Sequence, residues 1–313
     1  MLYGLGLIAG VVLAIQNPFN VNLGNRVHSA FLSGFVTYVI ASLYFVLILN
    51  VLGAHPLIVL GTAWQQGRIW MAAGLLSAGY VGSIILIFPK IGAVNAVIFP
   101  IMGQIISGVL IDSVGLLNVN PMPFTLIKFL GVVMMLLGVI CSAYVKNTGA
   151  QSKKPNWLYL IWGFVAGILL TLMGIFNGNL GTILTQDPKL GLTSMTGSLG
   201  ASFIAFSIGA LAFLCMAILK KEIYWSSLKT GFKSPLAWSS AVMGAFYVFC
   251  LTLLNPAVGP GLTISLNTVG LIIGTTGIEH FGWFKVQQHT VTWLKALGII
   301  FLIVGVILIK VIG

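Results

Sequence analysis

The stretch FNVNLG occupies Phe19 to Gly24, and a near copy, FNGNLG, occupies Phe176 to Gly181. Each copy follows a pair of glycines four residues apart, in GLIAG at 6–10 and in GFVAG at 163–167. Over both the glycine pairs and the phrase, matching residues are 157 positions apart. A phrase repeated at a constant distance indicates that the chain consists of two related halves.

The relation between the halves continues beyond this phrase. After an insertion in the second half, the distance between matching residues becomes 167. The pairs at this distance are Tyr80 and Tyr247, Pro89 and Pro256, Gly92 and Gly259, Gly103 and Gly270, Asp112 and Glu279, Gly131 and Gly298, and Gly138 and Gly305. We therefore predict a first repeat at 1–148, a polar linker at 149–157 and a second repeat at 158–313.

The composition predicts an all-α integral membrane protein. Hydrophobic residues make up 58% of the 313 residues and charged residues only 6%, whereas a soluble domain carries roughly 25% charged residues. Strands of alternating apolar and polar residues, which a membrane β-barrel needs, are absent from the sequence. Ten apolar runs predict membrane-spanning helices, at 2–22, 30–52, 69–88, 92–111, 124–145, 158–178, 195–219, 236–254, 259–278 and 291–310.

Two of the predicted connections are only four residues long. The third and fourth spans are joined by Pro89–Gly92, and the eighth and ninth are joined by Asn255–Val258. We predict a tight helical hairpin at each, in which Pro89 or Pro256 ends one helix and a glycine lies near the start of the next.

The ten predicted spans divide equally between the repeats. Because five is an odd number, the second repeat is predicted to cross the membrane upside down relative to the first. Such inverted five-helix repeats are typical of secondary transporters, whose substrate site lies between the repeats near the bilayer midplane. The alternative is a duplicated structural bundle without transport.

The positive charges predict the orientation. Eleven cations fall on one side of the ten spans and four on the other. Because Lys and Arg are enriched in cytoplasmic loops, the larger group is predicted to be cytoplasmic and both termini to be outside. The same rule explains the net charge of +11 without a nucleic-acid partner. The larger group is Arg26, Lys90, Lys146, Lys153, Lys154, Lys220, Lys221, Lys229, Lys233, Lys285 and Lys295, and the smaller is Arg68, Lys128, Lys189 and Lys310.

The amides of the repeated phrase are the first candidate site residues. Asparagine in hydrocarbon is costly unless it faces protein or a water-filled cavity. The functional reading is that Gln16, Asn17, Asn20 and Asn177 line a central cavity, and the structural reading is that they bond one helix to another. Further candidates for the cavity are Tyr80, Asn95, Gln104, Tyr247 and Asn267. An amide and aromatic lining would suit a small neutral or zwitterionic metabolite.

Two of the four acids are matched between the repeats. Asp112 and Glu279 each end the fourth span of their half, and His280 follows Glu279. A carboxylate at membrane depth can carry a proton or gate transport. The alternative is an interfacial ion pair with Lys128 or Lys295 that fixes a helix end.

The sequence contains no enzyme signature that we recognise. HExxH, paired intramembrane aspartates and the P-loop pattern are missing. No catalytic residue, metal site or cofactor is predicted, and Cys141, Cys215 and Cys250 have neither metal-ligand nor disulfide spacing. We therefore predict that the protein is not an enzyme.

With these features the sequence resembles the YdcZ family of the drug/metabolite transporter (DMT) superfamily, in a fused two-repeat form. The resemblance rests on GLIAGVVLAIQNPFNVNLG at the start, GQIISGVLIDSVG at 103–115, IEHFGWF at 278–284, and the paired segments LGVVMMLLGV and LGIIFLIVGV. It implies a multi-pass protein of the bacterial cytoplasmic (inner) membrane that exports a compound. The first repeat departs from the pattern at Ser113-Val114, where the second has His280-Phe281.

We therefore expect a secondary-active transporter, an exporter of a small metabolite or organic compound, that works by alternating access. Its expected partners are that substrate and the lipid bilayer, and a homodimer is left open beside a monomer. The alternative is a membrane scaffold, a subunit or a channel-like protein without substrate coupling.

Overall fold

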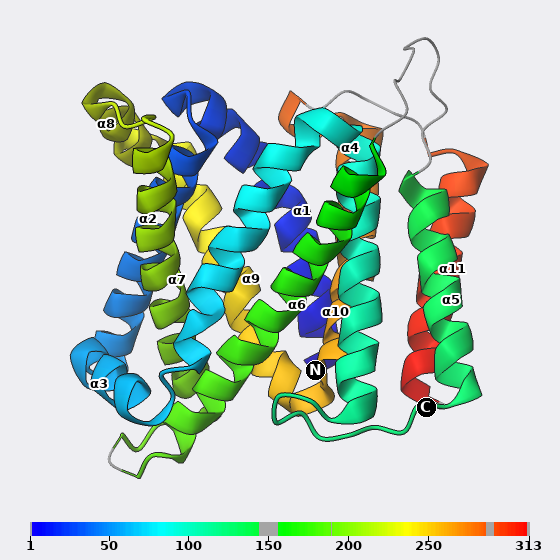
Figure 1. Ribbon diagram of the computed structural model, residues 1–313, viewed down its shortest axis with the longest axis horizontal. Helices are drawn as coiled ribbons and strands as arrows, with labels where there is room; N and C mark the ends of the chain where they lie inside the picture. Colours follow the sequence, from blue (N-terminus) through cyan, green and yellow to red (C-terminus); the bar gives the residue numbers. More distant parts are fainter. Residues whose placement is uncertain (1, 144–155, 189, 286–290, 312–313) are drawn as a thin grey trace. The chain divides into compact units, whose positions relative to one another are not determined.

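A computed structural model describes residues 2–143, 156–188, 190–285 and 291–311. These residues form helices and no strands (Figure 1). The elements are α1 (Leu2–Val27), α2 (Ala30–Val51), α3 (Pro56–Gln66), η1 (Trp70–Ala72), α4 (Ala73–Val114), α5 (Leu126–Ala143), α6 (Trp157–Gln186), α7 (Ser194–Leu219), α8 (Trp225–Lys233), α9 (Pro235–Val258), α10 (Pro260–Phe281), η2 (Trp283–Lys285) and α11 (Trp293–Val311). Most of the predicted linker, 149–155, lies outside the described residues.

Eight segments of the described chain are long and apolar enough to cross a membrane. Two of them, Trp70–Phe88 and Asn95–Val114, belong largely to α4. The apolar parts of α5 and α11 are shorter, at Leu126–Ser142 and Trp293–Ile309. An all-helical integral membrane fold follows, while the number of ten crossings stays a prediction.

The chain forms two compact units, and each unit contains parts of both predicted repeats. Unit 1 consists of Met1–Val11, Gly79–Thr171 and Val258–Gly313, and unit 2 consists of Val12–Ala78 and Leu172–Ala257. The chain passes from one unit to the other inside α1, α4 and α6 and at the last residue of α9. The division at 1–148 and 158–313 is a division by sequence repeat and stays a prediction.

The hairpin predicted at Pro89–Gly92 takes a different form in unit 1. The helical assignment of α4 runs through these residues without a break, so the prediction that Pro89 ends a helix is wrong. The chain nevertheless folds back. A Cβ built on Gly163 would lie 3.4 Å from Ile87 Cδ1 and 3.3 Å from Phe99 Cβ, although these two positions are about 18 Å apart in a straight helix.

At the matching place in the second repeat, a glycine ends the helix. Pro256 lies inside the last turn of α9, and α10 begins after Gly259, whose φ is +84°. A positive φ favours glycine because a Cβ would clash with the backbone. The prediction that Pro256 ends the helix is therefore wrong.

Helices α5 and α11 pack against each other in unit 1. A Cβ on Gly131 would lie 2.9 Å from the Gly305 carbonyl oxygen, and one on Gly138 would lie 2.8 Å from the Gly298 carbonyl oxygen. Since residue numbers rise along one helix and fall along the other, the pair is antiparallel. Small residues allow this close backbone approach.

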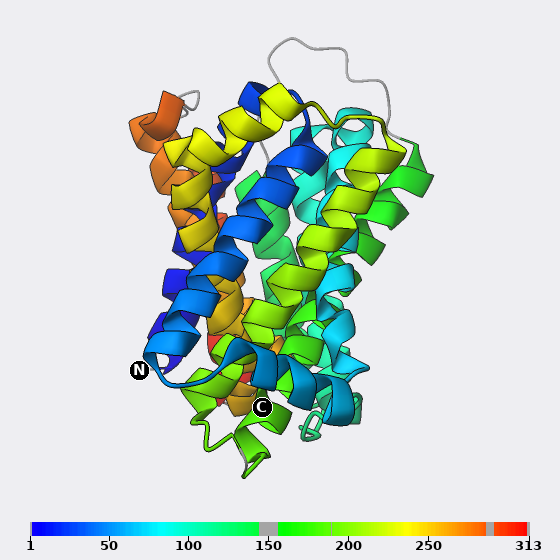
Figure 2. The ribbon, with the colours of Figure 1, turned by 90° about the vertical axis from the view of Figure 1, so that its left-hand side faces the viewer.

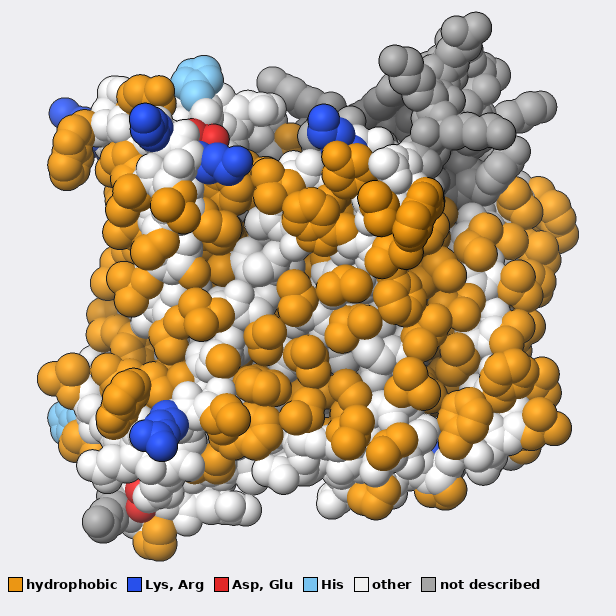
Figure 3. Space-filling view, in the orientation of Figure 1, with side chains coloured by type: hydrophobic (Ala, Val, Ile, Leu, Met, Phe, Trp, Pro, Cys, Tyr) orange, Lys and Arg blue, Asp and Glu red, His pale blue; other side chains and the backbone are white. Residues whose placement is uncertain are grey.

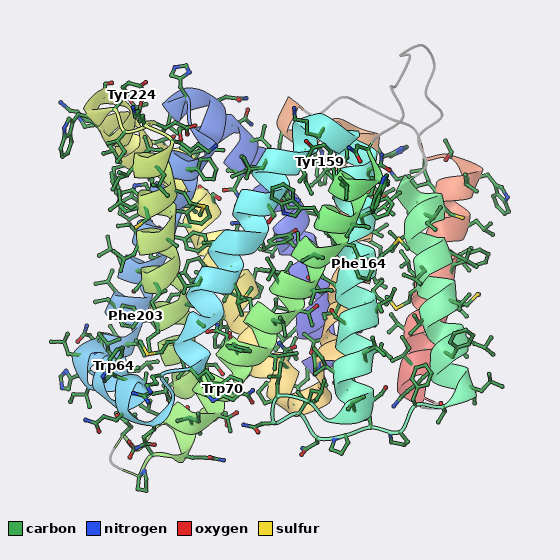
Figure 4. All side chains as sticks on the ribbon, in the orientation of Figure 1. Trp64, Trp70, Tyr159, Phe164, Phe203 and Tyr224 are labelled. Carbon is green, nitrogen blue, oxygen red and sulfur yellow. The ribbon has the colours of Figure 1, made fainter. Side chains whose placement is uncertain are left out.

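Two short helices absent from the predicted spans, α3 and α8, complete unit 2. α3 packs on α7 through Val59 and Gly200, and α8 packs on α2 through Gly231 and Val36. The two short helices lie at opposite ends of α2 and α7 (Figures 1 and 2). Trp70 and Phe203, labelled in Figure 4, pack against a buried apolar cluster that includes Val59.

The helix surfaces are apolar along their lengths. In Figure 3 orange hydrophobic side chains are spread over the middle of the face, while the Lys, Arg, Asp and Glu side chains lie toward its upper and lower edges. A water-facing protein would spread charges over this surface, whereas a hydrocarbon solvent excludes them.

Candidate functional site

The first asparagine motif contacts helix α9 in unit 2. Gln16 Nε2 donates a hydrogen bond to the Ser240 carbonyl oxygen at 3.1 Å, and Ser240 Oγ donates to Asn20 Oδ1 at 2.5 Å. Gln16 is buried and Asn20 is half-buried. A Cβ on Gly244 would lie 2.6 Å from Gln16 Nε2. A glycine on α9 therefore makes room for the buried amide.

The second asparagine motif contacts the same helix near its other end. Asn177 is fully buried, and its Nδ2 donates to Thr252 Oγ1 at 2.6 Å. The Thr252 hydroxyl donates to the Val248 carbonyl oxygen at 2.7 Å and lies 3.3 Å from Ser202 Oγ on α7. Asn177 thus joins α6 to α9, and a hydroxyl pair extends the polar contact to α7.

Asn255 of α9 lies against the same part of α6, at Gly174 and Gly178, although the sequence assigned it to a loop. It is 7% exposed, and its Nδ2 lies 2.6 Å from the position of a Cβ on Gly174. Among the described residues, Asn255 Oδ1 and Asn177 Oδ1 are buried without a hydrogen-bond donor. Two amide oxygens on facing helices therefore keep acceptor capacity for a polar group.

A stripe of small and polar residues on α9 is the signal that sequence reasoning missed. Ser240, Gly244, Thr252 and Asn255 recur at intervals that bring them to one side of a helix. Of the other predicted residues in unit 2, Asn17 is exposed and Tyr247 is buried on α9. The structure therefore brings Gln16 and Asn20 together through Ser240 and does not bring Asn17 into that contact.

The other predicted cavity residues belong to unit 1. Tyr80 and Asn95 are half-buried, and Asn95 Nδ2 donates to the Ile91 carbonyl oxygen of its own helix at 2.9 Å. Gln104 is buried, and its carbonyl oxygen accepts from Thr171 Oγ1 at 3.3 Å. Asn267 is buried on α10.

Two tight helix crossings in unit 1 match each other residue by residue. A Cβ on Gly10 of α1 would lie 2.1 Å from the Asn267 carbonyl oxygen, and one on Gly270 would lie 2.0 Å from the Leu7 carbonyl oxygen. In the other crossing, a Cβ on Gly167 of α6 would lie 2.0 Å from the Pro100 carbonyl oxygen. In the same crossing, a Cβ on Gly103 would lie 2.1 Å from the Phe164 carbonyl oxygen. Each crossing joins a helix of one repeat to a helix of the other.

Asp112, near the end of α4, is buried against the beginning of α10. Its Oδ2 accepts a hydrogen bond from the Gly261 backbone N–H at 2.6 Å, and its Oδ1 is buried without a donor among the described residues. A Cβ on Gly261 would lie 2.4 Å from Oδ2. A carboxylate at a helix N-terminus satisfies a free N–H and interacts favourably with the helix dipole. Asp112 thus ties the end of α4 to the start of α10.

The matching acid, Glu279, has a different environment. Its carboxylate forms an ion pair with the Lys295 ammonium, and the two side chains are 32% and 13% exposed. His280, beside it, is exposed at the end of α10. The ion-pair alternative from the sequence is therefore the arrangement at Glu279.

The contacts that the two asparagine motifs make with α9 are formed by amides and hydroxyls. Among the described residues, no three His, Cys, Asp or Glu side chains form a group that could hold a metal ion. Amide and hydroxyl groups can donate and accept hydrogen bonds without changing charge.

Both halves of the chain match one protein family. The family model described as "Putative inner membrane exporter, YdcZ" matches residues 1–141 and 158–308. No curated protein matches the sequence.

The fold is similar to that of solved structures. One of them, described only as "Crystal structure of protein", aligns with a TM-score of 0.65 and 13% identity over 99% of this chain and 96% of its own. At this identity the likeness shows the fold alone. The family match covers most of both halves, so the chain belongs to the YdcZ family (DMT_YdcZ) and is a multi-pass inner membrane transporter rather than an enzyme.

Proposed function

We propose that this transporter is a secondary-active exporter of a small neutral or zwitterionic organic compound. It works by alternating access between two inverted five-helix repeats, 1–148 and 158–313. The observation that carries the proposal is the pair of matching glycine crossings in unit 1. A contact from the first repeat to the second, Gly10 with Asn267, has a counterpart from the second to the first, Gly167 with Pro100.

A two-fold axis that relates the two repeats turns each contact from the first repeat to the second into an equivalent contact from the second repeat to the first. Residues 10 and 167 match at a distance of 157, and residues 100 and 267 match at a distance of 167. The same exchange recurs in unit 2, where α3 packs on α7 and α8 packs on α2. Inverted repeats of equal architecture can exchange conformations, which supports alternating access.

The substrate class follows from the polar residues. We assign substrate binding to Gln16, Asn17, Asn20, Tyr80, Asn95, Gln104, Asn177, Tyr247 and Asn267. These side chains carry no charge at neutral pH and offer both donors and acceptors. A permanently charged substrate would require a counter-ion near the middle of a span, and no predicted span carries an acid there. Asp112, Glu279 and His280 are assigned to proton transfer or gating.

The test begins with a thermal-shift screen of the purified protein against amino acids, nucleosides, sugars, organic acids and quaternary amines. A ligand that binds only the folded state raises the melting temperature. The compounds that do so are then measured as radiolabelled solutes in proteoliposomes. Saturable uptake that is accelerated by the same compound on the opposite side supports a carrier.

The other outcomes separate the alternatives. Saturable binding with flux that shows no acceleration by counterflow would indicate a channel. An absence of flux for every compound that binds would indicate a scaffold or subunit. The Asn20→Leu/Asn177→Leu double variant should lose transport and remain monodisperse. Asn25→Leu is the control, because Asn25 is exposed and lies outside the repeated phrase, and this variant should transport normally.

A further inference from the structure

Helix α8 combines a buried edge with an exposed basic face. Ser227 and Gly231 are buried, and a Cβ on Gly231 would lie 3.0 Å from Val36 Cγ2 on α2. On the opposite side, Trp225, Lys229 and Lys233 follow one another at intervals of four residues and therefore share one face of the helix. All three are exposed, Trp225 by 84%.

More cations surround this face of unit 2. Lys220 and Lys221 are exposed directly after the C-terminus of α7. Arg26 is exposed in the last turn of α1, which meets α8 where a Cβ on Gly231 would lie 3.2 Å from Val27 Cγ1. The one acid between Lys220 and Lys233 is Glu222, which accepts a hydrogen bond from Ser29 Oγ at 2.5 Å.

Aromatic side chains frame the cations. Tyr224 is 57% exposed at the start of α8 (Figure 4). Trp238, 42% exposed, donates its indole N–H to the Phe232 carbonyl oxygen at 2.9 Å and meets Tyr44 edge to face. Indole and phenol rings prefer the boundary between hydrocarbon and headgroups. Their exposure therefore favours a position of α8 at the membrane surface.

The short helix at the other end of unit 2 has none of this charge. α3 contains no Lys, Arg, Asp or Glu, and it exposes Leu57 by 82% and Trp64 by 65%. Arg68 is the exposed cation that follows it. Helix α8 is therefore a basic helix, whereas α3, on the same unit, carries no charge.

We propose that α8, with Lys220, Lys221 and Arg26, forms a binding surface for the phosphate groups of anionic phospholipids in the cytoplasmic leaflet. Lysines beside exposed aromatic rings on a helix that lies at the interface are suited to an anionic headgroup layer. The positive-inside rule assigns the same end of unit 2 to the cytoplasm. This binding does not depend on the transport proposal.

The test is a titration of the purified full chain in detergent with phosphatidylglycerol, with phosphatidylcholine and sodium phosphate as separate arms, read by thermal unfolding. Phosphatidylglycerol should raise the melting temperature, and the other two should not. The K229Q/K233Q variant should bind phosphatidylglycerol about 30-fold more weakly, because each interfacial lysine contributes about one kcal/mol. Salt at about 1 M should abolish the effect, since it shortens the Debye length to about 3 Å.

Two controls define the outcome. K229R/K233R keeps both charges and should bind like the wild type, and R68Q removes an exposed cation at the other end and should also bind normally. Equal stabilisation by phosphatidylcholine or by sodium phosphate would overturn the proposal, as would unchanged phosphatidylglycerol affinity in K229Q/K233Q. If the double variant unfolds, the single variants K229Q and K233Q are titrated, and each must bind more weakly than wild type for the proposal to stand.

Discussion

Asn20 and Asn177, which occupy the same position in the repeated phrase, hydrogen-bond to hydroxyl groups of one helix, α9. Asn20 accepts from Ser240, and Asn177 donates to Thr252. The two hydroxyls are about 18 Å apart along the helix axis. The equivalent positions in the first repeat are Ala73 and Ile85, which have no hydroxyl. One helix of the second repeat therefore holds both motifs, and the environments of the two motifs differ.

The bond between Asn177 and Thr252 should couple their contributions to stability. In a double-mutant cycle with Asn177→Ala and Thr252→Val, we expect a coupling of about 0.6 kcal/mol, the mean for hydrogen bonds between membrane helices, and at most about 1.7 kcal/mol. Reversible unfolding in mixed micelles measures it. The exposed Asn17→Ala is the control and should change stability little. A coupling near zero would mean that the contact contributes nothing.

The glycine crossings of unit 1 should not tolerate a methyl group. Gly10→Ala and Gly167→Ala each force a Cβ to about 2 Å from a carbonyl oxygen, so we expect a loss of roughly 1 to 3 kcal/mol from each. Gly4→Ala is the matched control, because a Cβ there meets nothing within 4 Å. Melting temperatures of the three variants decide the matter, and similar values for all three would contradict the packing argument.

Asp112 and Gly261 should be coupled sterically. Gly261→Ala moves a methyl group to 2.4 Å from Asp112 Oδ2 and should destabilise the protein. The same substitution should cost less in an Asp112→Ala background, where the carboxylate is gone. Asp112→Asn should be milder than Asp112→Leu, because the amide oxygen can still accept from the Gly261 N–H, whereas loss of a cap costs about 0.5 to 2 kcal/mol. Additive effects in the Gly261→Ala and Asp112→Ala cycle would exclude this contact.

The orientation can be tested independently of any substrate. A reporter fused after Gly313 should be periplasmic, because the cation count assigns both termini to the outside. Alkaline phosphatase activity should then be high and green fluorescence low. The reverse pattern would show that the number of spans or the assignment of sides is wrong.

Much of the helical content could be predicted because hydrophobic runs of this length have one stable form in a bilayer. The errors fell where local signals compete with packing. The chain reverses within α4 although the segment is helical through Pro89 and Gly92, so proline alone did not mark the boundary. α3 and α8 were missed because they are shorter than a span and lie at helix ends, where a hydropathy pattern is weak.

The sequence by itself determined the membrane class, the repeat and the family, because composition and residue spacing are properties of the chain that do not depend on how it folds. Only the tertiary structure decided which groups meet. Glu279 forms an ion pair with Lys295, whereas Asp112 accepts a hydrogen bond from the backbone at the start of α10, although the two acids match in the repeat. The tertiary structure also placed the buried Asn255 of α9 against Gly174 of α6. The physical reason is that a repeat conserves spacing along the chain, whereas a hydrogen bond depends on the helix packed opposite, which differs between the halves.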